Sequence, residues 1–556
     1  MKYESYLVNS LDTVFYDGKL YSDSIQSARI FKNEAFSFQT AFRAVFEDGE
    51  GNGWNDTSEF KVEIMSEINN SIDIYFVENV PAFRVGYSTA DDWFLRKNPG
   101  LYPDCLCRKS GNCFSVTAGY WKSIWININE NTDIKPGEYQ IGIKIINTEN
   151  NLTAAEKNIK IQVCDISLPK QNTVLTNWVH YDCISYFSRT KPFSDSFFSC
   201  LKKYIRMAAK NGQNMILTPA FTPPLDTPVG EERKTVQLVS VRKENGKYSF
   251  DFSLMKKFID TALSCGTEYF EHSHFYTQWG AKCAPKIIVT ENGKEKKMFG
   301  WHTDAQSDEY RYFLHSYITE LKKFMKTNGY EKRFFFHISD EPEEKNLKSY
   351  EFASKFLRNE LKGYLTGDSL SNYAFFENGL TDNPIVNTRS IKDFLGKTER
   401  LWLYYTGYEC NEYMSNRLIG MPQERGRILG FQLYYFGIKG FLNWGFNAHH
   451  NCLARSMVNP KISSDMNGDF VSGTSYLVYP DGKNVEPSVR LMTIRDEMQD
   501  IRACELLESL YGRNFVLSVI SKHIPDISFN CKIHADQILS LRSEINSKIQ
   551  TAYDNI

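Results

Sequence analysis

The chain has 556 residues, of which 42% are hydrophobic and 24% are charged, so it is long enough for two or three folded domains. A net charge of −2 argues against a surface of clustered Lys and Arg, and we therefore expect no nucleic-acid partner. No stretch approaches about 20 uninterrupted apolar residues, so we expect no membrane insertion. Aromatic residues make up 14% of the chain, which suits sugar binding but equally an aromatic core.

The first 19 residues lack the apolar run of a signal peptide. We therefore expect a cytoplasmic protein, unless a secretion signal has been trimmed from the sequence. The 12 cysteines are scattered, apart from Cys105, Cys107 and Cys113 in one loop-like stretch. Three thiols with a fourth ligand would suit zinc, but no second Cys/His pair lies nearby. Reduced thiols are the favoured interpretation, and we expect neither a metal nor a cofactor.

Residues 1–168 have the pattern of a β-rich domain. Short alternating runs recur at 36–46, 60–65, 73–80, 123–128 and 139–145. Turn residues, such as those at 135–138, separate them, and several short strands punctuated in this way predict a β-sandwich. Residues 168–173, with the sequence LPKQNT, are the expected linker to the next domain.

From residue 173 the pattern changes to strands that alternate with helices. Strand-like runs occur at 174–182, 215–221, 268–276, 333–340, 363–369, 384–388, 400–405 and 440–446, the run at 363–369 being the least clear. Helical patterns occur at 196–212, 253–266, 308–329 and 342–363. The alternation over 173–495 predicts a catalytic (β/α)8 TIM barrel. A doubly wound sheet is the alternative, but no Gly-rich phosphate loop follows an early strand. Residues 496–556 predict a short helical segment packed on the barrel.

Polar residues that close the barrel strands are the candidates for a site, because such barrels carry their active sites at the C-terminal strand ends. In the run from residue 333, strand alternation places His337, Ser339 and Glu341 on one face, opposite an apolar face that suits packing under helices. The polar face would point into the barrel, with Glu341 at its rim. Pro342 is expected to end this strand and to open the next helix.

Asp340 and Glu341 form a pair of carboxyl groups at this strand end. Burial and a neighbouring carboxylate both raise a carboxyl pKa, which keeps a proton available for general acid catalysis near neutral pH. The alternative is that Asp340 caps the next helix and Glu341 is a charge in its first turn. Their position at the end of a barrel strand, behind a polar inner face, favours catalysis.

Four segments of the chain resemble family 123 of the glycoside hydrolases. They are HISDEPEEKNLKSYEFASKFLR around the carboxylate pair, LWLYYTGYE, GFLNWGFN and PSVRLMTIRDEMQD. The resemblance covers most of the chain and implies a β-N-acetylgalactosaminidase with an N-terminal β-sandwich and a (β/α)8 barrel. It also implies that Glu341 is the general acid/base and that Asp340 holds the 2-acetamido group of the substrate.

The resemblance further implies a retaining, substrate-assisted mechanism on terminal β-linked N-acetylgalactosamine of a glycan or glycolipid-derived oligosaccharide. The acetamido oxygen would attack the anomeric carbon while Glu341 protonates the leaving oxygen, and Glu341 would then activate water to open the oxazoline. Asp340 would stabilise the charge that develops on the amide nitrogen. Strict alternation places Asp340 on the wrong strand face, so a bulge or bend is required there.

Further substrate-binding candidates come from other strand ends. Tyr404 should face the barrel lumen, where its hydroxyl could bond the acetamido oxygen, and Tyr405 replaces it if the strand phase is shifted by one. Trp444 is a candidate platform under the sugar, with Asn443 nearby, although each aromatic is equally compatible with the core. Candidates for binding hydroxyl groups are Trp279, His180, His274 and His337. For each histidine a structural role is the alternative.

Three other functions remain open at this stage. A metal-dependent barrel hydrolase would use His272 and His274 on one strand face, completed by His180, His337 and Asp340. A carbohydrate-binding protein would keep the barrel without activity. A β-N-acetylglucosaminidase would differ only in the orientation of the C4 hydroxyl of its substrate. We expect a monomer or a weak homo-oligomer.

Overall fold

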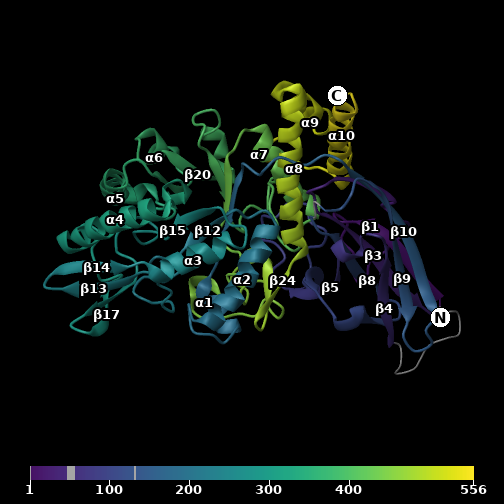
Figure 1. The fold of residues 1–556 in the computed structure, drawn as a ribbon, viewed down its shortest axis with the longest axis horizontal. Helices are drawn as coiled ribbons and strands as arrows, with labels where there is room; N and C mark the ends of the chain where they lie inside the picture. Colours follow the sequence, from purple (N-terminus) through teal and green to yellow (C-terminus); the bar gives the residue numbers. More distant parts are fainter. Residues whose placement is uncertain (1, 47–56, 131–132, 556) are drawn as a thin grey trace.

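The computed structural model describes residues 2–46, 57–130 and 133–555. In this part of the chain an N-terminal β-sandwich is followed by a (β/α)8 barrel and by C-terminal helices (Figure 1). The predicted fold class is therefore confirmed.

Two five-stranded sheets make the sandwich. The first has the order β1 (Lys2–Asn9), β3 (Phe36–Val45), β8 (Lys122–Ile128), β5 (Ile72–Ala82), β6 (Gly100–Cys107). The second has the order β2 (Ser27–Phe31), β10 (Thr153–Cys164), β9 (Gly137–Asn147), β4 (Thr57–Met65), β7 (Cys113–Thr117). Inward-facing apolar residues of both sheets, such as Phe38, Phe60 and Ile143, share one core. The five predicted runs correspond to β3, β4, β5, β8 and β9.

The barrel is an eight-stranded parallel sheet. Its order is β11 (Val174–Asn177), β22 (Gly440–Asn443), β21 (Trp402–Tyr405), β20 (Asn383–Asn387), β19 (Leu365–Leu370), β18 (Phe334–Phe336), β15 (Tyr269–His272), β12 (Met215–Thr218). All eight predicted strands are present. Side-chain amides join β11 to the chain before β12: the Asn177 amide donates to Gln213 Oε1 and the Gln213 amide donates to the Asn177 carbonyl, each at 3.1 Å.

Helices cover the outside of the barrel (Figure 1). They are α1 (Tyr181–Phe187), α2 (Asp195–Lys210), α3 (Ser253–Leu263), α4 (Asp308–Asn328), α5 (Leu347–Glu360), α6 (Tyr373–Glu377) and α7 (Gln423–Tyr435). The prediction that Pro342 opens a helix is wrong, because α5 begins at Leu347 after a 3-10 turn. Asn346 occupies the position before α5, so Asp340 does not cap a helix. The capping alternative for the carboxylate pair is thereby excluded.

A long helix, α8 (Val489–Tyr511), lies between the barrel and the sandwich, followed by α9 (Arg513–His523) and α10 (Ala535–Asp554) (Figure 1). The expected boundary after residue 495 falls inside α8. Arg490 of α8 donates to both carboxylate oxygens of Asp104 in β6 at 2.9 Å, and Arg542 of α10 pairs with Glu34 at 2.6 Å. Removing one partner of such a buried pair costs about 3–5 kcal/mol, so these contacts fix the sandwich on the barrel.

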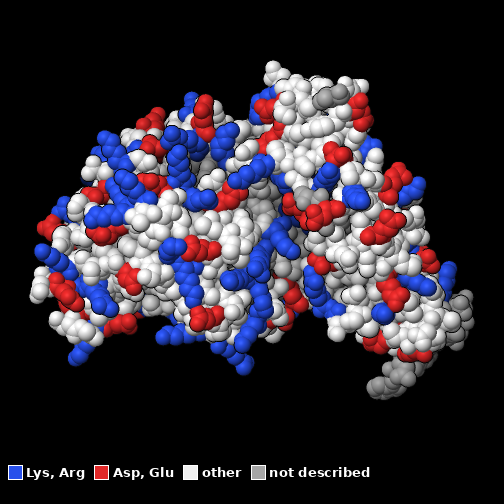
Figure 2. All heavy atoms as spheres, in the orientation of Figure 1, with Lys and Arg blue, Asp and Glu red and all other residues white. Residues whose placement is uncertain are grey.

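Two smaller sheets were not predicted. One has the order β14 (Lys247–Asp251), β13 (Ser240–Glu244), β16 (Ile287–Glu291), β17 (Lys294–Phe299), and the other is the hairpin of β23 (Val478–Asp481) and β24 (Asn484–Pro487). Charges of both signs are interspersed over the face shown in Figure 2, as the net charge of −2 suggests. Among the described residues, no helix is both long and apolar enough to span a bilayer.

Candidate active site

The barrel lumen is layered because alternate residues of each strand point inward. An apolar layer at the bottom includes Phe335, Trp402 and Leu442. Above it lie three buried ionisable groups, Glu271, His337 and Asp368. The candidate carboxylates follow His337 in the chain, and a charged layer therefore supports the site from below.

A bend after β18 turns the carboxylate pair toward the barrel mouth. The Asp368 carboxylate accepts the backbone N–H groups of Ile338 at 2.8 Å and Ser339 at 3.0 Å. Glu341 then has a φ of 42°, a left-handed conformation that is uncommon for a residue with a side chain, and its N–H donates to the Ser369 carbonyl at 3.1 Å. Such strain costs about 1–3 kcal/mol and persists where surrounding contacts impose it. The bend required by the sequence pattern is present.

Glu341 is held by a tyrosine from the opposite side of the lumen. The Tyr404 hydroxyl donates to Glu341 Oε1 at 2.7 Å, and the Ser371 hydroxyl lies 3.3 Å from Tyr404 Oη. The predicted inward orientation of Tyr404 is confirmed. Tyr405 instead packs outward against Phe441, with a ring-centroid distance of 4.8 Å, so it does not replace Tyr404.

The environment of the pair favours a retained proton. Asp340 and Glu341 are both half-buried. Burial raises the pKa of Glu341, while the hydrogen bond from Tyr404 opposes this shift. Burial and the nearby Glu341 and Asp368 carboxylates raise the pKa of Asp340 well above its usual value, against the opposing effect of His337. Both carboxyl groups are therefore harder to ionise than an isolated carboxyl group, which is the direction that general acid catalysis needs.

His337 is a buried cation under the pair. Its Nε2 lies 3.1 Å from Glu271 Oε1 and its Nδ1 lies 3.6 Å from Asp368 Oδ1. Burial lowers its pKa, but the adjacent Asp368 and Glu271 carboxylates outweigh burial and raise the pKa to about 9. We conclude that His337 is held inside the lumen as part of an ionic layer.

His274 also enters the lumen, where its ring stacks on His337 at a centroid distance of 4.6 Å and an interplanar angle of 22°. Both ring nitrogens of His274 are buried and have no partner among the described residues. Burial lowers the pKa of His274 well below its usual value, so the ring is neutral.

The histidine set of the metal-dependent alternative does not assemble. His272 points into the helical layer, where its Nε2 lies 2.8 Å from the Tyr317 hydroxyl of α4, and it does not share a face with His274. His274, His337 and Asp368 do lie close together. However, ring nitrogens bind metals in the plane of the ring, and two nearly parallel stacked rings cannot both direct a nitrogen at one ion.

His180 supports a loop at the mouth. Its Nε2 lies 3.0 Å from the Trp444 carbonyl oxygen and its Nδ1 lies 3.1 Å from Arg233 Nη2. Burial and the Arg233 charge lower the pKa of His180 to about 4, so it is neutral. Arg233 also forms a salt bridge of 2.8 Å with Asp182, and His180 is thus part of a buried polar cluster.

The remaining candidates have unequal access to the lumen. Trp444 is half-buried and packs against the lumenal group that includes Tyr404. Asn443 is buried, and its Oδ1 has no partner among the described residues. Trp279 is 40% exposed. Its backbone N–H donates to the Asp340 carbonyl at 2.8 Å, which places Trp279 beside the Asp340–Glu341 pair.

Three carboxylates in the lumen or at its rim were not predicted from the sequence. Glu271 occupies an inward position of its strand, Asp368 lies in the least clear strand run, and Glu409 follows β21. Glu409 accepts the Asn387 amide at 2.9 Å and the Thr406 N–H at 2.7 Å. Glu271 and Asp368 could have been predicted from the sequence, because each is a charged residue at an inward-facing position of an otherwise buried strand.

Comparisons with known proteins agree with this geometry. The profile of the glycoside hydrolase 123 catalytic domain matches residues 178–507, more than half of the chain. A family 123 glycoside hydrolase from Clostridium perfringens, described for glycolipid glycan hydrolysis, superposes with a TM-score of 0.74. That similarity has 14% identity and covers 100% of this chain and 99% of the other, and it shows the shared fold.

More distant solved structures include Bacteroides uniformis β-glucuronidase 2, with 8% identity, a TM-score of 0.30, and 85% of this chain and 48% of the other covered. A Rhizomucor miehei family 5 mannosidase has 10% identity and a TM-score of 0.32, with 63% and 96% covered. These two are too dissimilar to inform the site, and no curated protein matches the chain. On the strength of the catalytic-domain match, the chain belongs to glycoside hydrolase family 123 and is a glycosidase.

Proposed function

We propose that this enzyme removes terminal β-linked N-acetylgalactosamine, with retention of configuration, by substrate-assisted catalysis. The observation that carries the proposal is the bend after β18, which brings Asp340 and Glu341 to one mouth with Tyr404 on Glu341. The family resemblance implies the sugar. The glycolipid glycans hydrolysed by the Clostridium perfringens relative make a glycan or glycolipid-derived oligosaccharide the natural substrate class in this proposal.

In the proposed reaction the acetamido oxygen of the sugar attacks the anomeric carbon and the bond to the leaving oxygen breaks. Glu341 gives its proton to that oxygen. Asp340 accepts the amide N–H and stabilises the positive charge of the oxazolinium that forms. Tyr404 donates to the acetamido oxygen once substrate displaces it from Glu341. Glu341 then takes a proton from water, which attacks the anomeric carbon and reopens the ring on the original face.

Glu271, Asp368 and Glu409, the three other carboxylates described above, are already engaged, which supports a nucleophile supplied by the substrate. Glu271 accepts from the Thr176 hydroxyl at 2.7 Å and contacts His337, and Asp368 accepts two backbone N–H groups. Glu409 accepts from Asn387 and Thr406. An enzymatic nucleophile in a retaining glycosidase would need a free carboxylate about 5 Å from the acid. A neighbouring pair such as Asp340 and Glu341 suits assistance by the acetamido group instead.

Aromatic side chains at the mouth complete the proposed subsite. Trp444 packs against the lumenal group that includes Tyr404 and is half-buried, as expected for a platform under the apolar face of a pyranose. Trp279 is exposed next to Asp340, where it would contact the sugar or the following residue of the glycan.

A comparison of aryl β-glycosides of N-acetylgalactosamine, N-acetylglucosamine and galactose tests the proposal. We expect turnover of the N-acetylgalactosaminide, a rate lower by orders of magnitude for the galactoside, and first release of the β-anomer by NMR. A thiazoline analogue of the cyclised intermediate should bind much more tightly than the product sugar. Equal cleavage of the galactoside, together with weak thiazoline binding, would refute substrate assistance. Preference for the N-acetylglucosaminide would instead correct only the sugar.

A further inference from the structure

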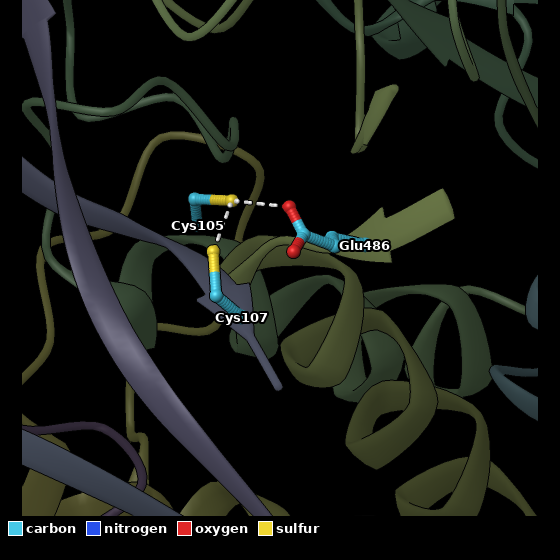
Figure 3. Close-up of side chains that lie close together, drawn as sticks. All are labelled: Cys105, Cys107 and Glu486. Atoms are coloured by element: carbon cyan, nitrogen blue, oxygen red, sulfur yellow. Dashed lines mark hydrogen bonds between the residues drawn. The ribbon is translucent and has the colours of Figure 1, made fainter. Parts of the chain in front are cut away.

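A second cluster of reactive side chains lies where the sandwich meets the catalytic part of the chain. Cys105 and Cys107 lie two residues apart on edge strand β6, and Glu486 approaches them from the hairpin strand β24 (Figure 3). The two sulfur atoms are 3.4 Å apart, and Cys105 Sγ lies 3.6 Å from Glu486 Oε2. Cys105 is 1% exposed, whereas Cys107 and Glu486 are half-buried.

The three cysteines that are close in sequence, Cys105, Cys107 and Cys113, do not all lie together in the fold. Cys113 begins β7 in the other sheet of the sandwich, is exposed, and contacts the Gly111 carbonyl. The carboxylate of Glu486, which is almost four hundred residues from Cys105 in the chain, lies near the thiol pair instead of Cys113. Cys105 also forms a backbone bridge with Ser488, the residue before α8, so the cluster spans a contact between two domains.

The distances match the ligand spacing of a tetrahedral zinc site. With a Zn–S bond of about 2.3 Å and a Zn–O bond of about 2.1 Å, the S–S edge is about 3.8 Å and the S–O edge about 3.6 Å. The corresponding separations here are 3.4 and 3.6 Å. A disulfide suits the pair less well. Residues two apart on a strand have Cα atoms about 6.7 Å apart, at the upper limit for a disulfide.

Charge balance also favours a divalent ion. Lys461 Nζ contacts Glu486 Oε2, the same oxygen that faces Cys105. Two thiolates and one carboxylate carry three negative charges, which Lys461 and a divalent cation neutralise completely. A monovalent cation would leave the buried cluster negative, at a large cost in free energy.

We propose that Cys105, Cys107 and Glu486 bind a zinc ion that joins the N-terminal sandwich to the catalytic part, with water as the fourth ligand. This site departs from the expectation, drawn from the sequence, that the chain binds no metal. The ion supplies stability and takes no part in sugar hydrolysis, because its ligands come from β6 and β24 and none lies in the barrel lumen. Binding releases the thiol protons, so zinc uptake should strengthen as the pH rises.

The test uses the full chain with three single variants. Cys107→Ser and Glu486→Gln each remove one ligand at a half-buried position, and Cys113→Ser is the matched control at an exposed cysteine. After dialysis against zinc and then against buffer, we expect one zinc per chain in the wild type and in Cys113→Ser, and clear loss in the other two. Cobalt substitution should give thiolate-to-cobalt charge-transfer absorption in the wild type that weakens in Cys107→Ser. Removal of zinc with EDTA should lower the melting temperature and leave kcat on an aryl glycoside unchanged.

Several results would overturn the proposal. A folded wild type that takes up no zinc and gives no cobalt charge-transfer band would show that the Lys461–Glu486 ion pair alone satisfies the cluster. A Cys105–Cys107 disulfide found by mass spectrometry of the purified protein would assign the thiols to redox chemistry. Equal zinc content in all four proteins would place the metal elsewhere. If Cys107→Ser fails to fold, Glu486→Gln decides, because it keeps both thiols and nearly the same volume.

Discussion

Replacing Asp368 by asparagine tests whether this residue positions the proposed catalytic pair, Asp340 and Glu341. Asp368 accepts the N–H groups of Ile338 and Ser339 and the Tyr350 hydroxyl, at 2.8, 3.0 and 2.8 Å. Its carboxylate also faces the His337 cation. The Asn side chain has nearly the same shape, but one of the two acceptor oxygens becomes a donor that faces another N–H or hydroxyl group.

The size of the effect follows from these contacts. A hydrogen bond to a charged group contributes roughly 1.5–3 kcal/mol, and loss of one partner of a buried ion pair costs about 3–5 kcal/mol. We therefore expect a loss of stability of about 3–5 kcal/mol. If the bend relaxes and the pair moves by about 1 Å, kcat should fall about 100-fold. Affinity for the product sugar should change less, because Asp368 does not line the mouth.

The assay is steady-state hydrolysis of an aryl β-N-acetylgalactosaminide combined with thermal unfolding of the same protein. Asp104→Asn is the matched control, since Asp104 is also buried, pairs with the Arg490 cation at 2.9 Å and accepts the Tyr479 hydroxyl. Both variants should lose thermal stability, but only Asp368→Asn should lose kcat at a temperature where both are folded. A wild-type kcat in Asp368→Asn, or an equal loss in both variants, would refute the positioning role.

Three further predictions concern the pair and its support. Glu341→Gln should reduce turnover by roughly 10²–10⁴-fold for a substrate with a poor leaving group and much less for an activated aryl glycoside, and equal slight losses would remove Glu341 as the acid. Tyr404→Phe should move the alkaline limb of the kcat/KM–pH profile to higher pH, because in the free enzyme the Tyr404 hydrogen bond lowers the pKa of Glu341 and its loss raises that pKa. A limb that stays in place or moves down would contradict this assignment. The pKa of His337 is raised from 6.5 to about 9, so its stabilising contribution of about 3 kcal/mol is complete below pH 6.5 and disappears as the pH rises to 9. The stability difference between wild type and His337→Gln should shrink over that range, and a pH-independent difference would show that His337 does not titrate there.

The elements of the fold could be predicted from the sequence because their signals are local. Alternation with period 2 and amphipathic helical patterns identified all eight barrel strands and several helices. The inward phase of Tyr404 followed from the same alternation. The need for a bend at Asp340 followed from that alternation together with the role that the family resemblance implies for Asp340. The start of α5 was predicted too early, because Pro342 is compatible with a first helical turn but does not require one.

What the sequence determined by itself was the candidate carboxylate pair, its place at the end of a strand and the class of fold, since each depends on residues close together in the chain. The tertiary structure alone decided which groups act on that pair. Asp368 reaches the backbone before Asp340 from the next strand, and Glu341 adopts its left-handed φ because contacts from Ser369 and Tyr404 hold it there. Cys105 likewise meets Glu486 only through the packing of β24 on the sandwich. Such partners are distant in sequence, and no periodic pattern specifies a contact that forms only when separate elements pack together.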